Sequence, residues 1–389
     1  MSQQISLVFS MKSSTKSNEK LLTNYCQRAI IQNMKKFLKV LLAIIAVILL
    51  VVLIYVAYVF ISYYRLEDNL TLEVTNPITA EVQTNEEYTL LSWNIGFGAY
   101  EVDYDFFMDG GTQSWATSKE DLKENLEEIS AFIEEENADF NFIQEVDYNS
   151  TRTYHVDERP YIISALSGQA YVFAQNYDSP FLFYPLTQPH GKSKAGIMTF
   201  SSFGITSAIR RSLPIEESVA KLVDLDRCYS VSRVMVENGK ELVLYNLHLS
   251  AYTTDGTIAI EQLEMLVQDM QAEYEKGNYC IAGGDFNKDV VGLGCEVFGL
   301  EKQEYTWAQP IPDSVFDGSE IELVAPFDAN DPVASCRLPD EAFWEGQFQI
   351  TVDGFMVSPN VEVKEAKVLD TGFEYSDHNP VELTFSLKD

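Results

Sequence analysis

Hydrophobic residues follow a helical period in two stretches of the chain. Ser118, a typical helix N-cap residue, precedes a segment in which apolar side chains recur every three or four residues, and Asp121 lies three positions after it. A second segment has similar spacing and ends near Gly277. The apolar positions are Leu122, Leu126, Ile129 and Ile133 in the first segment and Ile260, Leu263, Leu266, Val267 and Met270 in the second. We expect both stripes to pack on a core.

Short apolar stretches of the kind that forms strands alternate with these helical segments. They cover residues 88–95, 139–144, 196–200, 241–247, 279–283 and 350–358. Strands that alternate with helices predict the α/β class. The region from residue 87 onward is long enough for a single sandwich with a two-sided core.

Residues 40–61 form an uninterrupted run of uncharged, mostly apolar residues. As a helix, this run is long enough to cross a hydrocarbon core of about 30 Å. It exceeds the apolar region of a secretory signal, about 7–15 residues, and no small-residue cleavage site follows it. Lys35, Lys36 and Lys39 precede it and place its N-terminal side in the cytoplasm by the positive-inside rule. We therefore predict a single-pass anchor with the rest of the chain outside the cytoplasm.

These patterns divide the chain into a basic cytoplasmic tail over 1–39, a transmembrane helix over 40–63, a stalk over 64–86 and a folded domain over 87–389. The stalk segment is polar, contains Pro77 and shows no sustained period. Met34 stands directly before the lysines that flank the apolar run. Residues 1–33 are therefore either a short tail or an extension upstream of the natural start.

Charge narrows the choice of partners. Lys and Arg number 27 against 59 Asp and Glu, and 46% of residues are hydrophobic, which excludes a wholly disordered chain. Seven basic residues and one acidic residue fall in 1–39 and none in 40–63, which leaves a net charge of −38 after residue 63. Such acidity opposes binding of duplex nucleic acid unless the cleft is locally basic. Five scattered cysteines exclude a disulfide-built scaffold, while a single Cys295–Cys336 pair stays open.

Polar residues stand at the ends of the predicted strands. The segments are SWNI at 92–95, QEVD at 144–147, NLHL at 246–249, GGDFN at 283–287, VDGF at 352–355 and YSDHNP at 375–380. Each segment alone is typical of a turn or a solvated strand end. Acids, amides and imidazoles that converge at successive strand ends are what a metal-assisted hydrolytic site needs.

In this order and at comparable separations, the six motifs resemble those of the endonuclease/exonuclease/phosphatase superfamily. This superfamily includes deoxyribonuclease I, the abasic-site endonucleases, inositol polyphosphate 5-phosphatases and neutral sphingomyelinases. The resemblance covers residues 87–389. It implies a four-layer α/β sandwich, in which helices flank two packed mixed β-sheets, and hydrolysis of phosphate esters with Mg²⁺, or with Mn²⁺ in its place.

The resemblance also implies roles for individual residues. Glu145 is the first metal ligand, Asn94 supports the metal and phosphate site, and Asp377 adds a further carboxylate. His378 is the general base, because an imidazole accepts a proton near neutral pH, and Asp353 fixes its tautomer.

Three further residues complete the expected site. Asp285 and Asn287 orient the attacking water and hold the phosphate, and Asp285 is a second candidate contact to the metal. His248 either stabilises the transition state or protonates the leaving oxygen. An imidazole here resembles the deoxyribonuclease, sphingomyelinase and phosphatase branches rather than the abasic-site endonucleases.

Other chemistry-bearing residues are harder to place. We expect His155 and His190 to be surface or loop residues. Residues 308–349 form either a lid over the site or a packing insertion. Four cations either reach a substrate phosphate or have a structural or solvated role: Lys192, Lys194, Arg152 and Arg233.

The function favoured by these patterns is a membrane-anchored, extracytoplasmic, Mg²⁺-dependent phosphoesterase that acts on lipid headgroups or small organophosphates. An extracytoplasmic nuclease with the same fold and chemistry is the second hypothesis, and the acidic charge disfavours it. A catalytically silent surface-binding module is the third. No pattern in the sequence sets the oligomeric state.

Overall fold

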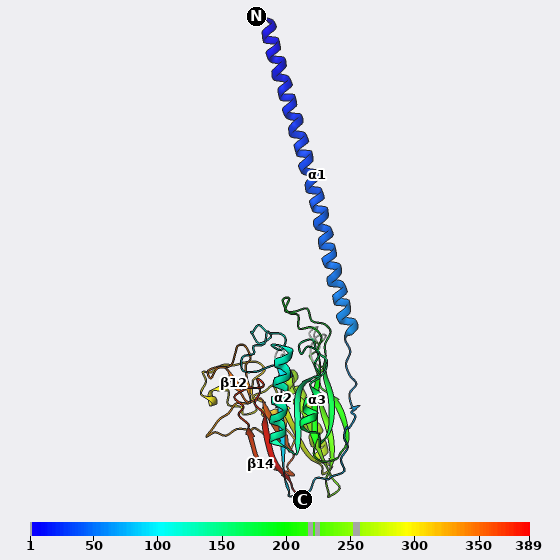
Figure 1. Ribbon diagram of the computed structural model, residues 1–389, viewed down its shortest axis with the longest axis vertical. Helices are drawn as coiled ribbons and strands as arrows, with labels where there is room; N and C mark the ends of the chain where they lie inside the picture. Colours follow the sequence, from blue (N-terminus) through cyan, green and yellow to red (C-terminus); the bar gives the residue numbers. More distant parts are fainter. Residues whose placement is uncertain (1, 217–220, 222–225, 252–256) are drawn as a thin grey trace. The chain divides into compact units, whose positions relative to one another are not determined.

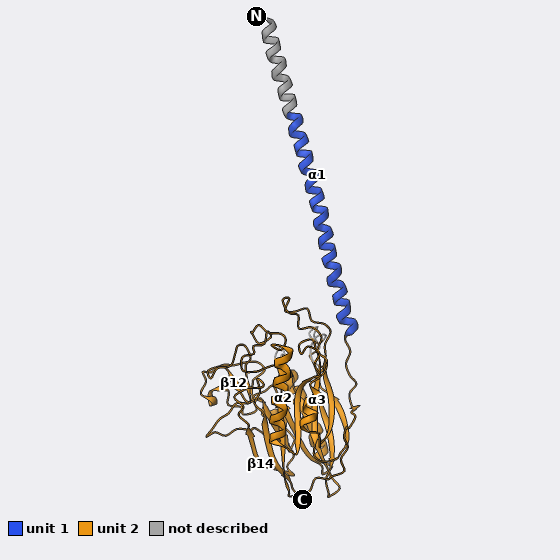
Figure 2. Ribbon diagram, in the orientation of Figure 1, with its two compact units in different colours: residues 1–62 blue, residues 63–389 orange. Residues whose placement is uncertain are grey.

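The computed structural model describes residues 2–216, 221, 226–251 and 257–389, and the chain divides into two compact units, residues 1–62 and 63–389 (Figure 2). The first unit is a single helix, α1 (Ser2–Ser62). Its segment Lys20–Ser62 has a window of mean hydropathy 3.5, long and apolar enough to cross a membrane. None of that apolar stretch is buried, unlike the core helix of a soluble protein.

The second unit is built on two large β-sheets (Figure 1). Among the described residues, the first sheet has, in spatial order, β1 (Leu70–Thr71), β6 (Ile205–Ser212), β7 (Cys228–Met235), β8 (Glu241–His248), β9 (Tyr279–Asp285), β13 (Asp353–Val357) and β10 (Glu322–Val324). The second has β14 (Val361–Val368), β15 (Val381–Leu387), β2 (Glu87–Asn94), β3 (Phe140–Asp147), β5 (Lys194–Ser201) and β4 (Ala170–Asp178). Two short strands, β11 (Cys336–Arg337) and β12 (Gln349–Ile350), form a separate pair.

Three apolar cores hold the layers together. The core between the sheets contains side chains from both, among them Leu90, Phe142, Leu244 and Ile281. A second core joins β2, β3 and β5 to α2 (Lys119–Glu136) and α3 (Arg159–Ala165). A third joins β7, β8 and β9 to α4 (Thr257–Tyr274). The layers are therefore helix, sheet, sheet and helix, and the predicted four-layer α/β sandwich is confirmed.

The two predicted helices form as expected. The backbone N–H of Asp121 donates to Ser118 Oγ at 3.1 Å, so Ser118 caps α2, and Asn137 ends it in the left-handed conformation. All four apolar positions predicted for α2 are buried. In α4 the predicted stripe is buried except for Ile260, which is partly buried.

The structure divides one predicted strand into two and contains further strands that the sequence analysis did not predict. The stretch predicted over 350–358 is two strands, because β12 ends at Ile350 and β13 begins at Asp353. Among the described residues, eight strands were not predicted: β1, β4, β6, β7, β10, β11, β14 and β15. Four of them, β1, β10, β14 and β4, are the edge strands of the two large sheets. In β6 polar and charged residues outnumber apolar ones, so its hydrophobic signal is weak.

The predicted stalk over 64–86 packs on the second unit and is corrected accordingly. Within it, β1 pairs with β6, Thr75 bridges to Tyr171, and Val82 bridges to Val236 and is fully buried. Edge strands present unpaired backbone groups, and this segment satisfies some of them. The compact unit therefore begins at Tyr63 rather than near Glu87.

Candidate active site

Strand register brings the predicted site residues to one end of the sandwich. In the first sheet His248 pairs with Asp285 across the parallel strands β8 and β9, and Asp353 pairs with Asp285 from the antiparallel strand β13. In the second sheet Asn94 ends β2 beside β3, the strand that carries Glu145. The two sheets meet here, because Asn94 Nδ2 donates to Asp285 Oδ2 at 3.1 Å.

Two backbone features explain how the strands deliver these side chains. Gly284 has φ +143, and a Cβ at this position would lie 2.0 Å from the Leu247 carbonyl oxygen, so β8 and β9 approach this closely only beside glycine. Glu145 has φ 58 and lies in a register shift between Ile143 and Val146. A bulge of this kind redirects a side chain at a strand end, and a non-glycine residue in this conformation is typical of functional sites.

His378 and Asp353 form a buried pair. His378 Nδ1 lies 2.7 Å from Asp353 Oδ2, and Ser335 Oγ donates to the same oxygen at 2.7 Å. Burial alone favours the neutral imidazole, but the carboxylate of Asp353, with further help from Asp377, raises the pKa of His378 well above its ordinary value. The carboxylate thus holds a proton on Nδ1 and leaves Nε2 facing Asp285 Oδ2 at 3.8 Å.

Asp285 stands at the centre of the group. Its Oδ1 accepts from the backbone N–H of Asn287 at 2.8 Å, and Asn287 Nδ2 donates to the Leu249 carbonyl at 2.8 Å. Burial raises the pKa of Asp285 to about 7, His378 opposes the rise, and the charge of Asp353 adds to it. The carboxyl therefore sits in a dry, negatively charged environment.

The pKa of His248 is shifted in the opposite direction from that of His378. His248 Nε2 lies 3.5 Å from Asp285 Oδ2, and its Nδ1 has no hydrogen-bond partner within the described part of the chain. Burial, followed by the charges of Arg227 and His378, lowers the pKa of His248 well below its ordinary value. The ring is therefore neutral at pH 7 and offers a hydrogen bond rather than a charge.

The donor set suits a small, hard cation. Asn94 Nδ2 lies 3.4 Å from Glu145 Oε1, so one amide touches the carboxylates of both Glu145 and Asp285, while its Oδ1 accepts from Gly96 N–H at 3.1 Å. Burial raises the pKa of Asp377 to about 6, with His378 opposing and Glu145 contributing to the rise. Crowded acids of this kind create the negative potential that a divalent cation offsets.

Across the described residues, no three His, Cys, Asp or Glu side chains are grouped closely enough to hold a metal by themselves. Mg²⁺ usually binds through one or two carboxylates and completes its octahedral shell with water and substrate oxygens. Glu145, Asp285 and Asp377 are the carboxylates available for this, and the arrangement fits Mg²⁺ or Mn²⁺ better than a metal that requires a full protein cage.

Arg152 and Asp147 are buried beside the site, and their sequence context predicts no definite role for them. Arg152 Nε and Nη2 donate to the two oxygens of Asp147, both at 2.9 Å, and the guanidinium lies 3.8 Å from the Phe97 ring centroid. Nη2 of Arg152 is also 4.0 Å from Glu145 Oε2. Arg152 is thus a structural cation that faces the acidic group. In the sequence, Arg152 stands two residues after the QEVDYNS segment at 144–150, and this closeness to Glu145 was the one indication of its place beside the site.

The remaining cations pair away from this group. Lys192 and Lys194 contact Asp178 at 3.2 and 3.0 Å, and Arg233 contacts Glu241 and Glu273, both at 2.6 Å. These contacts favour the structural alternative for all three. The five cysteines are free thiols, so Cys295 and Cys336 are not bridged in this structure.

The two remaining histidines differ. His155 is exposed, as predicted, with Nδ1 2.8 Å from Asn149 Oδ1. His190 lies in a loop, one of the two expected alternatives, but it is only 3% exposed and is therefore not a surface residue. Its Nδ1 contacts the Ser114 carbonyl oxygen at 3.2 Å, and burial together with the charge of Arg152 lowers the pKa of His190 to about 3.

The segment 308–349 contributes directly to the site. Ser335 bonds Asp353, and Cys336 forms an antiparallel bridge with His378. Arg337 is fully buried, and its Nη2 donates to the Glu101 carbonyl at 3.0 Å. Residues 335–337 are therefore packed into the domain and contact the buried pair of His378 and Asp353.

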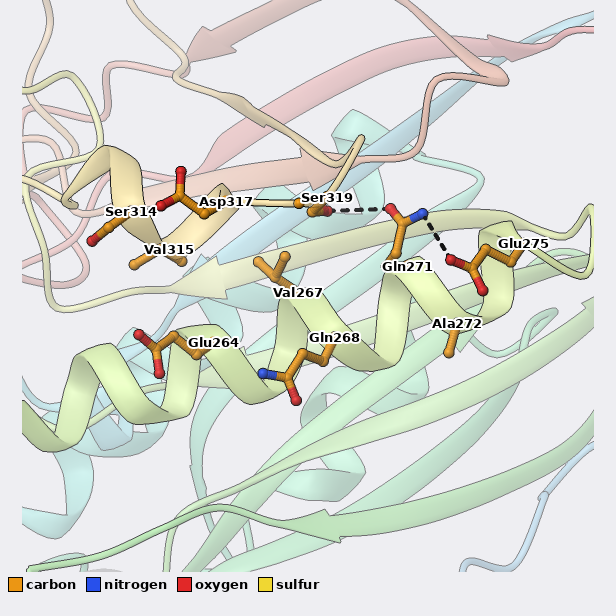
Figure 3. Close-up of a pocket in the computed structure, with 11 residues that line it drawn as sticks. Glu264, Val267, Gln268, Gln271, Ala272, Glu275, Ser314, Val315, Asp317 and Ser319 are labelled. Atoms are coloured by element: carbon orange, nitrogen blue, oxygen red, sulfur yellow. Dashed lines mark hydrogen bonds between the residues drawn. The ribbon is translucent and has the colours of Figure 1, made fainter.

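A pocket of about 540 Å³ lies elsewhere, between α4 and residues 314–319 (Figure 3). Gln271 spans it by contacting Ser319 Oγ at 3.2 Å and Glu275 Oε1 at 3.4 Å. It contains none of the predicted site residues. Its lining lacks a histidine, cysteine or basic residue, and we assign it no chemistry.

Comparisons with known proteins agree with the fold. The model of the Endonuclease/Exonuclease/phosphatase family matches residues 91–378, whereas no curated protein matches the chain. A solved endonuclease/exonuclease/phosphatase from Beutenbergia cavernae DSM 12333 is 17% identical, with a TM-score of 0.53 over 78% of this chain and 72% of that one. ANGEL2, a 2′,3′-cyclic phosphatase solved with adenosine-2′,3′-vanadate, is also 17% identical, with a TM-score of 0.52 over 83% of this chain and 99% of its own. Since the family model spans most of the second unit, this chain belongs to the endonuclease/exonuclease/phosphatase family.

Proposed function

We propose that this protein is a metal-dependent phosphoric ester hydrolase, anchored in a membrane by its N-terminal helix with the catalytic unit outside the cytoplasm. The observation that carries the proposal is the convergence of Asn94, Glu145, Asp285, Asp353 and His378 at one end of the sandwich, linked by contacts of 2.7 to 3.8 Å. The family includes enzymes that cleave phosphate esters, which supports the same reaction type here.

In the proposed mechanism, each residue acts through the geometry described above. In its neutral form, His378 accepts a proton from the attacking water at Nε2, and Asp353 holds the ring in the required tautomer. Asp285 and Asn287 orient the water and the phosphate, and neutral His248 donates a hydrogen bond to the developing charge. Glu145, Asn94 and Asp377 would hold Mg²⁺ or Mn²⁺, which supplies neutralisation of charge on the phosphoryl oxygens when bound.

The substrate proposed is a lipid headgroup or a small organophosphate. The apolar helix keeps the catalytic unit close to a membrane surface, and a net charge of −38 after residue 63 disfavours duplex DNA. A nuclease remains the second candidate, because the family also contains such enzymes.

The test is a hydrolysis assay with the full chain, Mg²⁺ and a substrate panel. The panel contains sphingomyelin, phosphatidylinositol phosphates, small phosphodiesters, a 2′,3′-cyclic nucleotide, plasmid DNA and RNA. We expect metal-dependent cleavage of a lipid or small ester, abolished by His378→Ala and retained in the exposed control His155→Ala. Cleavage of nucleic acid alone would favour the nuclease, and wild-type activity in His378→Ala would refute the mechanism.

A further inference from the structure

One loop of the second unit exposes large apolar side chains that the proposed chemistry does not use. It joins β4 to β5 over residues 179–193, and Leu182 and Gly191 close its neck with two backbone hydrogen bonds of 2.9 and 3.1 Å. Beyond the neck, Phe183, Tyr184 and Leu186 are 54%, 67% and 86% exposed. We call these three residues the loop tip. Grouped apolar exposure of this kind marks an interaction surface.

The loop is also uncharged within a strongly acidic region. Residues 179–191 contain no Asp, Glu, Lys or Arg, although the net charge after residue 63 is −38. The cations that follow, Lys192 and Lys194, are paired with Asp178 and are not available to attract anions freely. An uncharged apolar tip on an acidic surface matches an apolar partner rather than a charged one.

Contacts with the rest of the fold hold the returning arm of the loop. Ser114 Oγ donates to the Gln188 carbonyl at 2.6 Å, and Trp115 Nε1 donates to the Pro189 carbonyl at 2.7 Å. Because these bonds fix the backbone at Gln188 and Pro189, they also restrict the backbone of the adjoining loop tip. Less conformational entropy is then lost when the tip is immobilised in a partner.

The base of the loop lies where the chain enters the second unit. Tyr64 OH donates at 2.7 Å to Asp178 Oδ2, and Asp178 is the last residue of β4, directly before the loop. The apolar run that we propose as a membrane anchor ends at residue 61. An extended chain spans at most about 3.6 Å per residue, so the backbone of Tyr64 lies within about 11 Å of the end of the apolar run. The loop therefore starts close to the membrane surface if residues 40–61 span the bilayer.

We propose that Phe183, Tyr184 and Leu186 insert into the interface of the bilayer that holds the anchor. The inference rests on the anchor in the proposed function. Aromatic and aliphatic side chains bury favourably at the headgroup level, and the acidic surface around them is repelled by anionic lipid. The occupant is thus the zwitterionic lipid surface, held by apolar insertion. A second attachment beside the anchor limits rotation of the catalytic unit over the lipid.

The test uses the full chain in phosphatidylcholine nanodiscs. An environment-sensitive fluorophore is attached at Leu186→Cys in a Cys26→Ser background, since the other four cysteines are buried. Glu275→Cys is the matched control, because Glu275 is exposed beyond the C-terminal end of α4, near the start of β9 and away from the His248 end of the sheet. We expect a blue-shifted emission at position 186 and at least twofold quenching by spin-labelled lipids, with neither effect at position 275.

Equal quenching at the two positions would overturn the proposal, whether or not the protein hydrolyses any ester. Release of the chain from bilayers by an alkaline wash would overturn it as well, since the anchor would then be absent. The readout needs no turnover, so it separates failure of the loop from failure of the enzymatic function.

A variant of the loop tip gives an independent readout once a substrate is known. Phe183→Ser, Tyr184→Ser and Leu186→Ser are combined, and all three side chains lie outside the core. We expect about tenfold slower cleavage of a bilayer-embedded ester and unchanged cleavage of a water-soluble one. An equal change on both substrates would contradict interfacial insertion.

Discussion

Replacement of Arg152 by methionine tests the buried charge network beside the site. Arg152 and Asp147 are 7% and 0% exposed, and two hydrogen bonds of 2.9 Å join them. Methionine keeps most of the apolar stem that packs near Phe97 but removes the guanidinium. Asp147 is then left buried without its counter-charge.

The structure sets the size of the effect. Removal of one partner from a buried ion pair typically costs about 3–5 kcal/mol, because the remaining charge loses its compensation. We expect Arg152→Met to lower the free energy of unfolding by about this amount. The double variant Arg152→Met with Asp147→Asn also removes the unpaired carboxylate of Asp147. Its free energy of unfolding should be at least about 1 kcal/mol higher than that of Arg152→Met alone.

The assay is urea unfolding of the full chain in detergent, followed by tryptophan fluorescence. All four tryptophans lie after residue 63, so the signal reports the second unit. Arg159→Met is the matched control, because its pair with Asp157 at 2.8 Å is partly exposed and should contribute less than about 1 kcal/mol. If Arg152→Met cost no more than Arg159→Met, the assignment of a buried structural cation would be refuted.

Three further outcomes follow from the site and its surroundings. Asp353→Asn should lower kcat by about 10²- to 10⁴-fold with the fold intact, because the amide no longer fixes the tautomer of His378, and a steady-state assay beside a thermal melt would check this. Glu145→Gln should raise the Mg²⁺ concentration for half-maximal activity at least about tenfold, measured by titration after chelation, and an unchanged titration would exclude it as a ligand. Burial disfavours the charged form of Glu273, but Arg233 above all holds the pKa of Glu273 at about 2. Its folded-state pKa is below the unfolded value of about 4.3, so its stabilisation is present above that pH and disappears as pH falls through 2. Glu273→Gln should therefore cost about 1–2 kcal/mol at pH 6 and almost nothing at pH 2 in urea titrations.

The candidate site was identified from the polar residues at the ends of the predicted strands. The GDFN motif at 284–287 and the SDHNP motif at 376–380 lie far apart in sequence, yet Asp285 and His378 face each other at 3.8 Å. Family resemblance supplied that pairing, since spacing along one chain does not reveal which strand ends are neighbours. Their chemical roles stay proposals until the substitutions above are made.

Two of the strands that we did not predict have an alternating pattern of apolar and polar residues that is typical of strands. The sequences of β14 (VEVKEAKV) and β15 (VELTFSL) alternate apolar and polar residues, the pattern of a strand with one solvated face. In the segment expected as a stalk, apolar residues also alternate with single polar ones, but only over short stretches: Leu70, Leu72 and Val74, and then Ile78, Ala80 and Val82. Such a segment packs only because the edge of a sheet is available, which is a property of the assembled fold.

Residues close together in the chain are enough to predict the apolar run at 40–61, the α/β alternation, the cap of α2 and the polar strand ends. Which groups are buried, and which partner each one contacts, depends instead on how distant segments pack. Burial of His190, the pairing of Arg152 with Asp147 and the bond from Ser335 to Asp353 depend on contacts between segments distant in sequence. The raised pKa of Asp285, about 7, arises in the same way, since desolvation and neighbouring charge exist only once the two sheets have packed together.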